Sequence, residues 1–374
     1  MLVTIVMKLR FILAATLVCM VAAAGYASAQ DAEITPEATP QILLNALPPL
    51  VRLEGLTPVY QDVNRCSAAA LSIQLSYYDW GGTYTDTIHG LNPHAEDVAV
   101  RLDEMISFAN GYGLEGIERT GGTLDMLKRL VAAGFPVLIE NSYFEGAGGL
   151  NDWMGHNRVV MGYDDAQGAI LTFDSLLGNG PDNTGRPIPY TDVDERWRTF
   201  NRDYLVLYRP EQEALLQQVM GDQWDTTINA EWTLEQSQAE VGTPREDSFT
   251  WFNIGTALLA LNRNEEAAQA FDAAINNGLP WRMMWYQYGP LEAYLRVGRY
   301  ADVITHAARV ISTTPGVKKL ITMSQWALKA WAICSARKLI LRSPFSAIPT
   351  TPPLSRRWHV YERQWEPLRR STNE

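Results

Sequence analysis

The feature that most constrains the fold is a pair of β-branched and aromatic runs around a short turn, "HNRVVMGYDDAQGAILTFDS" over residues 156–175. The turn-forming residues Asp164 to Gly168 separate the two runs, so the stretch predicts a β-hairpin. The stretch "FPVLIE" before it is typical of a buried strand, and "DYLVLY" after it predicts a last strand. A run of strands therefore occupies the middle of the chain.

Three helical patterns precede these strands. Apolar residues recur at helical spacing in Ser67 to Trp80, which Gly81-Gly82 ends, in Arg101 to Ala109, and in Leu124 to Ala133, which Gly134 closes. Helices followed by strands indicate an α+β fold with an antiparallel sheet. We expect one such domain over residues 51–210.

The chain after this domain is predicted to be helical. Residues 211–245 are polar and form a helical connector. In residues 246–331, Trp251, Gly255 and Ala267 recur 34 positions later as Trp285, Gly289 and Ala301. This spacing resembles the tetratricopeptide repeat, which implies an all-α module of paired helices. Such repeats bind partners on a concave surface, so a protein partner is one possible ligand of this region.

The two ends of the chain have their own composition. Residues 1–29 resemble a secretory signal peptide, with Lys8 and Arg10 before an apolar run and a cleavage site at Ala27-Ser28-Ala29. An uncleaved anchor is the alternative. After cleavage we expect no membrane span, a linker over residues 30–50, and a secreted or extracytoplasmic protein, with the cell surface as an option.

The C-terminal segment, residues 332–374, is Pro-rich and basic, with eight Lys and Arg against three Asp and Glu. It is predicted to be disordered and does not continue the repeats. A reading-frame change in the gene and a natural disordered tail both explain it.

Charge and cysteine content narrow the functional classes. The net charge of -11 argues against nucleic acid as a partner, since phosphate binding requires surplus Lys and Arg. Signal cleavage would leave Cys66 and Cys334, which are too few and too far apart for a disulfide framework. Cys66 is thus either a buried structural thiol or a nucleophile.

The surroundings of Cys66 favour the nucleophile. Cys66 lies where a helix is expected to begin, and the positive end of a helix dipole favours a thiolate. His156 opens a predicted strand, and strand alternation places it on the same face as Asp174, assuming a turn centred near Ala166. The carboxylate would then orient the imidazole as in a Cys-His-Asp triad.

Two of these assignments have alternatives. Asp164 and Asp165 are rivals of Asp174 but more often serve the hairpin turn. Gln61, five residues before Cys66, offers a side-chain amide for an oxyanion hole, and Asn64 competes with it.

The stretches "YQDVNRCSAAALSIQLSYYDW" and "GHNRVVMGYDDAQGAILTFDS" together resemble the bacteriocin-processing cysteine peptidases that cleave double-glycine leaders, and their stand-alone exported relatives. The resemblance implies a papain-like domain with Gln61, Cys66, His156 and Asp174 as its functional set, and thiol-dependent amide cleavage that needs no metal or cofactor. One position departs from the family: Ser67 follows Cys66, where the family has glycine.

We therefore expect an exported cysteine peptidase that hydrolyses peptide or protein substrates through a thioester, with helical repeats that dock substrate or partner. The alternative is a catalytically inactive papain-like scaffold that binds peptides, which the Ser67 departure favours. Transfer of the acyl group to an amine would use the same thioester and remains a third option.

Overall fold

The computed structural model describes residues 47–91, 100–144, 153–313 and 321–332. Its strands are β1 (Leu50–Arg52), β2 (Glu115–Arg119), β3 (Val137–Phe144), β4 (Trp153–Asp164), β5 (Ala169–Phe173), β6 (Arg186–Pro189) and β7 (Tyr204–Tyr208). The helices among them are α3 (Cys66–Ser76), α4 (Tyr84–Leu91), α5 (Leu102–Asn110), α6 (Leu124–Ala132) and α7 (Tyr190–Trp197). Those after the last strand are α8 (Glu213–Met220), α9 (Thr226–Gln238), α10 (Ser248–Ala260), α11 (Asn264–Asn276), α12 (Met283–Tyr286), α13 (Gly289–Arg296) and α14 (Tyr300–Ile311), followed by a helix over 321–332.

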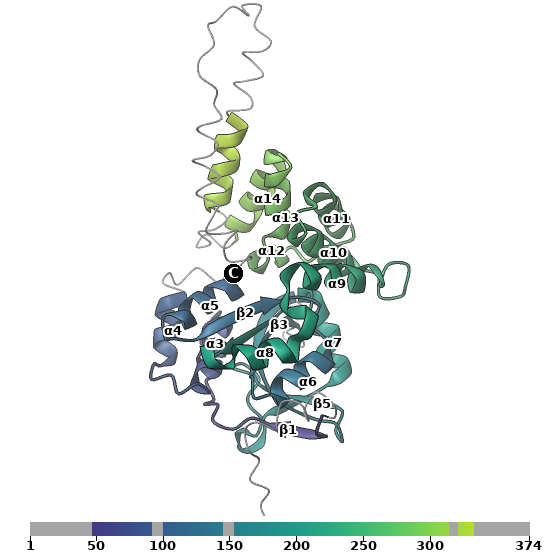
Figure 1. The fold of residues 1–374 in the computed structure, drawn as a ribbon. Helices are drawn as coiled ribbons and strands as arrows, with labels where there is room; N and C mark the ends of the chain where they lie inside the picture. Colours follow the sequence, from purple (N-terminus) through teal and green to yellow (C-terminus); the bar gives the residue numbers. More distant parts are fainter. Residues whose placement is uncertain (1–46, 92–99, 145–152, 314–320, 333–374) are drawn as a thin grey trace, which may run out of the picture. The chain divides into compact units, whose positions relative to one another are not determined.

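The strands of the described residues form one antiparallel sheet in the order β2-β7-β3-β4-β5-β6, with β1 added to the end of β4. The predicted hairpin is confirmed as β4 and β5, and the predicted last strand, β7, lies inside the sheet between β2 and β3. Figure 1 shows these strands with the helices that cover them.

Helices cover both faces of the sheet because its central strands are apolar on both sides. On β7, Leu205 and Leu207 belong to one buried cluster, together with apolar residues of α3, α4 and α5. The alternate residues Tyr204, Val206 and Tyr208 belong to a second cluster, which contains apolar residues of α6, α7 and α8. The resulting α+β domain with an antiparallel sheet agrees with the sequence prediction.

The helical region has its own buried cluster, centred on Phe271. A Cβ atom at Gly255 would lie 2.7 Å from the Phe271 ring, and one at Gly289 would lie 2.8 Å from it. Glycine at these two positions, 34 residues apart, therefore allows the helices to approach the same ring. The identity of this region as tetratricopeptide repeats stays a prediction.

Three expectations are corrected or fall outside the description. The predicted helix from Ser67 to Trp80 ends at Ser76, because Asp79 adopts a left-handed conformation (φ 59°) and the Tyr78 hydroxyl donates to the carbonyl oxygen of Leu207. The predicted linker over 30–50 includes Leu50, the first residue of β1. The predicted signal peptide, most of the linker and all but the first residue of the predicted tail lie outside the described residues.

Within the described ranges, no helix combines the length and the apolar character that crossing a bilayer requires.

Candidate active site

Cys66 is the first residue of α3, and the local sequence explains why the helix begins there. Asn64 takes a left-handed conformation (φ 58°), which asparagine tolerates, and turns the chain into the helix. Residues 67–75 are all buried, whereas Cys66 itself is partly exposed. The thiol therefore lies at the positive end of a buried helix with access to solvent.

A pair of polar side chains joins the start of α3 to β4. The Ser67 hydroxyl donates to Asn157 Oδ1 over 2.9 Å, and both residues are buried. The Cys66 thiol lies 3.6 Å from the same oxygen. Ser67 and Asn157 directly follow Cys66 and His156, so their hydrogen bond fixes the helix that carries the thiol against the strand that carries the imidazole.

His156 is held by Asp174, as strand alternation predicts. His156 Nε2 lies 2.9 Å from Asp174 Oδ1, and both side chains are buried. Asp174 also accepts a 2.6 Å hydrogen bond from Arg158 Nε and bonds from the backbone N–H groups of Leu176 and Leu177. Because Nε2 faces the carboxylate, Nδ1 is the ring nitrogen left for the thiol.

An irregularity in β4 creates this arrangement. Near the turn, Gly162 pairs with Leu171, but beyond Met161 the register shifts, so that Val160 pairs with Thr172. Without the shift, Asp174 would lie opposite Val159, on the opposite face from His156. The bulge at Met161 therefore brings the carboxylate to the imidazole.

The three groups change one another's proton affinity. Burial opposes ionisation of the Cys66 thiol, but the hydrogen bond and charge of His156 and the backbone N–H of Asn157 lower its pKa below the ordinary value. Burial likewise opposes the charged imidazole, yet the bonds to Asp174 and Cys66 raise the pKa of His156 to about 9. Burial alone would raise the pKa of Asp174, but the hydrogen bonds and charges of His156 and Arg158 hold it well below the usual range. The arrangement therefore favours a thiolate beside an imidazolium.

Gln61 lies next to this group without a bond to Cys66 among the described contacts. Its backbone N–H donates to the carbonyl of Ser175 over 3.0 Å, and its Oε1 accepts from the Ser175 hydroxyl over 2.8 Å. These bonds fix the amide so that Nε2 remains to donate to another group. Its competitor, Asn64, is an exposed turn residue.

The rivals of Asp174 have structural roles in the hairpin turn. Asp164 accepts from the N–H groups of Ala166 and Gln167. Asp165 pairs with Lys128 at 2.7 Å. Neither reaches His156 in the described structure.

Several residues near the thiol were not predicted from the sequence. Asn157 and Arg158 follow His156 directly, and only the register of β4 could have indicated their roles. Glu140, paired with Asn157 across β3 and β4, is buried. Burial, followed by the charge of Cys66, raises the pKa of Glu140 to about 8. Nothing in the sequence marks this glutamate.

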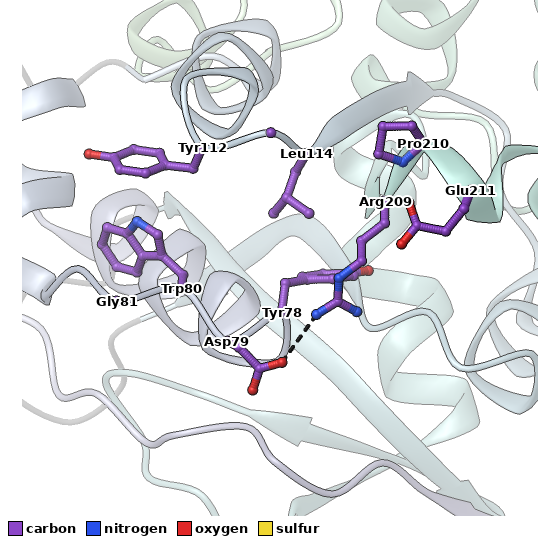
Figure 2. A pocket seen from close by; sticks show the side chains of 10 residues that line it. Tyr78, Asp79, Trp80, Gly81, Tyr112, Leu114, Arg209, Pro210 and Glu211 are labelled. Carbon is purple, nitrogen blue, oxygen red and sulfur yellow. Dashed lines mark hydrogen bonds and ion pairs between the residues drawn. The ribbon is translucent and has the colours of Figure 1, made fainter.

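The pocket drawn in Figure 2 lies elsewhere. It has a volume of about 280 Å³ and opens beyond the C-terminal end of α3, where Arg209 pairs with Asp79 at 3.2 Å and stacks over Tyr78. Cys66 is at the other end of that helix, roughly 16 Å away at 1.5 Å per residue. The pocket therefore contains none of the predicted site residues. No cluster of three or more metal-ligating side chains occurs within the described ranges.

Comparisons with known proteins identify the first domain. Residues 45–205 match the Peptidase C39 like family. No curated protein matches the chain. The solved structures similar to it include a C39-like peptidase from Bacillus anthracis, with 16% identity, 43% of this chain and 98% of that chain covered, and a TM-score of 0.33.

Two further structures show comparable similarity. A double-glycine motif protease from an AMS/PCAT transporter, solved with its leader peptide, has 18% identity, covers 42% of this chain and 93% of its own, and gives a TM-score of 0.31. Xylellain, a cysteine protease from Xylella fastidiosa, has 19% identity to this chain. The match covers 45% of this chain and 89% of xylellain, with a TM-score of 0.30. Residues 45–205 thus form a peptidase C39-like domain, and the helical region that follows carries no family assignment.

Proposed function

We propose that the chain is a cysteine peptidase that hydrolyses peptide bonds with Cys66 as nucleophile, His156 as acid and base, and Asp174 as the group that orients the imidazole. The observation that carries this proposal is the 2.9 Å contact between His156 Nε2 and Asp174 Oδ1 beside a thiol at a helix N-terminus. A lowered thiol pKa and a raised imidazole pKa are what a thiolate–imidazolium pair requires.

The reaction follows from these positions. The Cys66 thiolate attacks the peptide carbonyl, and the carbonyl oxygen becomes an oxyanion. The Gln61 amide and the backbone N–H of Cys66 donate to that oxygen. His156 gives its proton to the leaving amine, and the C–N bond breaks to leave a thioester. His156 then takes a proton from water, which attacks the thioester and regenerates the thiolate.

The proposal extends to location and to the helical region. The composition of residues 1–29 supports export, and the 34-residue spacing supports a docking role for the helices. Cell fractionation with an antibody against the mature chain tests export, and recovery of the full-length, uncleaved chain in the cytoplasm would contradict it.

A labelling and cleavage experiment tests the chemistry. Wild-type protein, Cys66→Ala and His156→Ala are incubated with a mixture of internally quenched peptides, with the exposed histidine His89→Ala as matched control. We expect His156→Ala to lower the cleavage rate about 10²- to 10⁴-fold, as loss of a general acid and base does. Cleavage by Cys66→Ala at the wild-type rate would reject the proposal.

The same experiment separates the alternatives. A catalytically silent scaffold would show an ordinary thiol pKa and equal iodoacetamide labelling of wild type and His156→Ala. An acyl transferase would join added amines to the peptide fragments instead of releasing free carboxylates. Ser67, the residue that favours the scaffold, is buried with its hydroxyl directed to Asn157.

A further inference from the structure

The second predicted repeat has a broken first helix, and the sequence explains the break. The first helix of the preceding repeat, α10, runs without interruption from Ser248 to Ala260. Its counterpart stops at Tyr286, passes through an extended Gln287 (φ -120°, ψ 119°), and resumes at Gly289. Pro290 has no N–H to donate to the Tyr286 carbonyl, so the helical hydrogen-bond pattern is interrupted here and a new helix starts with this proline in its first turn.

The break places Gln287 on the peptidase domain. Gln287 Nε2 lies 3.2 Å from Glu140 Oε2 and 3.4 Å from Asp203 Oδ2, and both carboxyl groups belong to buried residues. Glu140 is the cross-strand partner of Asn157, the residue after His156. Gln287 therefore reaches β3, the neighbour of the strand that carries the imidazole.

Tyr286 lies on the residue before His156. A Cβ atom at Gly155 would be 3.2 Å from two carbon atoms of the Tyr286 ring, so the ring rests directly on the glycine backbone. The edges of the same ring contact Trp153 and Phe200, with centroids 6.1 and 5.9 Å apart. Tyr286 as a whole remains partly exposed.

Cys66 is close enough to act on this segment electrostatically. Burial is the main cause that raises the pKa of Tyr286, and the charge of Cys66 is the second. The same two causes, in the same order, raise the pKa of Glu140. Tyr286 and Glu140, the partner of Gln287, therefore both lie within electrostatic reach of the thiol.

We propose that Tyr286 and Gln287 border the active site on the leaving-group side, and that Tyr286 selects an apolar residue directly after the cleaved bond. This inference rests on the proposed function, because the side of the active site follows from the chemistry. His156 protonates the leaving amine, so the groups that flank His156 border the segment that leaves. A partly exposed aromatic residue at that place favours an apolar side chain over a hydrogen atom.

Capture of the acyl-enzyme by added amines tests the selectivity. An acetyl-dipeptide thioester with a small leaving thiol acylates Cys66, and leucinamide and glycinamide then compete to resolve the thioester from the leaving-group side. We expect wild type to favour leucinamide about tenfold or more, within the usual range for one apolar contact. Tyr286→Ala should bring the ratio of the two products close to one, and Tyr286→Phe should keep the preference.

Trp285→Ala is the matched control, since Trp285 belongs to the same short helix but packs within the helical region against Trp281. It should leave the ratio within about twofold of wild type. A wild-type ratio near one, or a ratio that Tyr286→Ala does not change, would overturn the inference while leaving the peptidase proposal intact.

Alkylation tests the position of Tyr286 without any turnover. The rates at which N-phenylmaleimide and iodoacetamide modify Cys66 are compared by mass spectrometry of the Cys66 peptide. Tyr286→Ala should raise the rate of modification by N-phenylmaleimide, relative to that by iodoacetamide, about fivefold. Trp285→Ala should leave this ratio of rates unchanged. If wild type forms no acyl-enzyme, the proposed function fails, and the ratio of the two alkylation rates alone tests the position of Tyr286. A ratio that Tyr286→Ala leaves unchanged would mean that Tyr286 does not border the thiol.

Discussion

The ion pair between Asp174 and Arg158 offers the sharpest test of how the site is held together. Asp174 is fully buried and Arg158 is 5% exposed, and Arg158 Nε donates to Asp174 Oδ2 over 2.6 Å. Asp174→Asn keeps the shape of the side chain but leaves the guanidinium buried without its counter-charge. Removing one partner of a buried pair costs about 3–5 kcal/mol, a large part of the roughly 5–15 kcal/mol that stabilises a typical domain.

A double-mutant cycle isolates the coupling. Arg158→Gln alone removes the positive charge and leaves Asp174 with His156 and two backbone donors, so its cost should be about 1–3 kcal/mol. The double variant should cost less than the sum of the single ones, with a coupling of about 2 kcal/mol or more. Urea unfolding at pH 7 measures all four free energies. Additivity within about 0.5 kcal/mol would refute the reasoning, because Arg158 would then not depend on the carboxylate.

The sign of the pH dependence gives this prediction a second check. The folded protein holds the pKa of Asp174 well below its usual range. The carboxylate therefore contributes its full stability above the ordinary aspartate pKa of about 3.9, and this contribution is lost as the pH falls through the folded value. The gap between wild type and Asp174→Asn should accordingly narrow in acid, and a gap that widens would contradict the assignment.

The site leads to four further predictions. Peptidase activity should fall above about pH 9, where His156 loses its proton. At pH 6, His156→Ala should slow the alkylation of Cys66 by iodoacetamide about tenfold or more. Equal alkylation rates in wild type and variant would mean that the imidazole does not activate the thiol. Ser67→Ala removes the hydroxyl that donates to Asn157 over 2.9 Å and should lower the free energy of unfolding by about 1–3 kcal/mol. Ser67→Thr keeps a hydroxyl and should retain most of the wild-type stability in urea titrations. Equal losses of stability in the two variants would disprove a role for the hydroxyl. Glu140→Gln should raise the thermal midpoint more at pH 9 than at pH 5, because a carboxyl whose pKa is raised to about 8 destabilises the fold as the pH rises to that value; the reverse order would contradict its burial as a charged group.

The strands β3, β4, β5 and β7 were predictable because their apolar pattern is strong on both faces. β4 and β5 follow from alternation and the turn between Asp164 and Gly168, and β7 from the run of apolar residues after Asp203. The short strands β2 and β6 were missed, since each has only one or no buried apolar residue. Their pairing with β7 and β5 forms the strands, and that pairing leaves no local signal.

The candidate site shows the same division. Cys66, His156 and Asp174 could be selected by residue type and by strand alternation. The alternation argument nevertheless relied on a turn centred near Ala166, and the observed pairing near the turn has a different centre, which the bulge at Met161 compensates. A bulge depends on both strands and on β1 packing against Gly162, so sequence alone does not reveal it.

Gln287 illustrates what lies beyond sequence reasoning. Its position in a predicted repeat marks it as an ordinary helical residue, and only Pro290 indicates a break. That the break meets Glu140, 147 residues earlier, is a property of the folded chain.

The bulge at Met161 has a consequence for how the hairpin tolerates changes in length. Residues 165–168 lie outside the ladder, so an inserted peptide tag there leaves every cross-strand pair in place. Excising Met161 would likewise keep Val160 opposite Thr172, and with it the position of Asp174. One residue inserted between His156 and Val160, or between Thr172 and Asp174, would instead place the carboxylate on the opposite face from the imidazole. Length can therefore vary freely at the tip of this hairpin, whereas an odd number of residues inserted between the bulge and the catalytic side chains would separate the carboxylate from the imidazole.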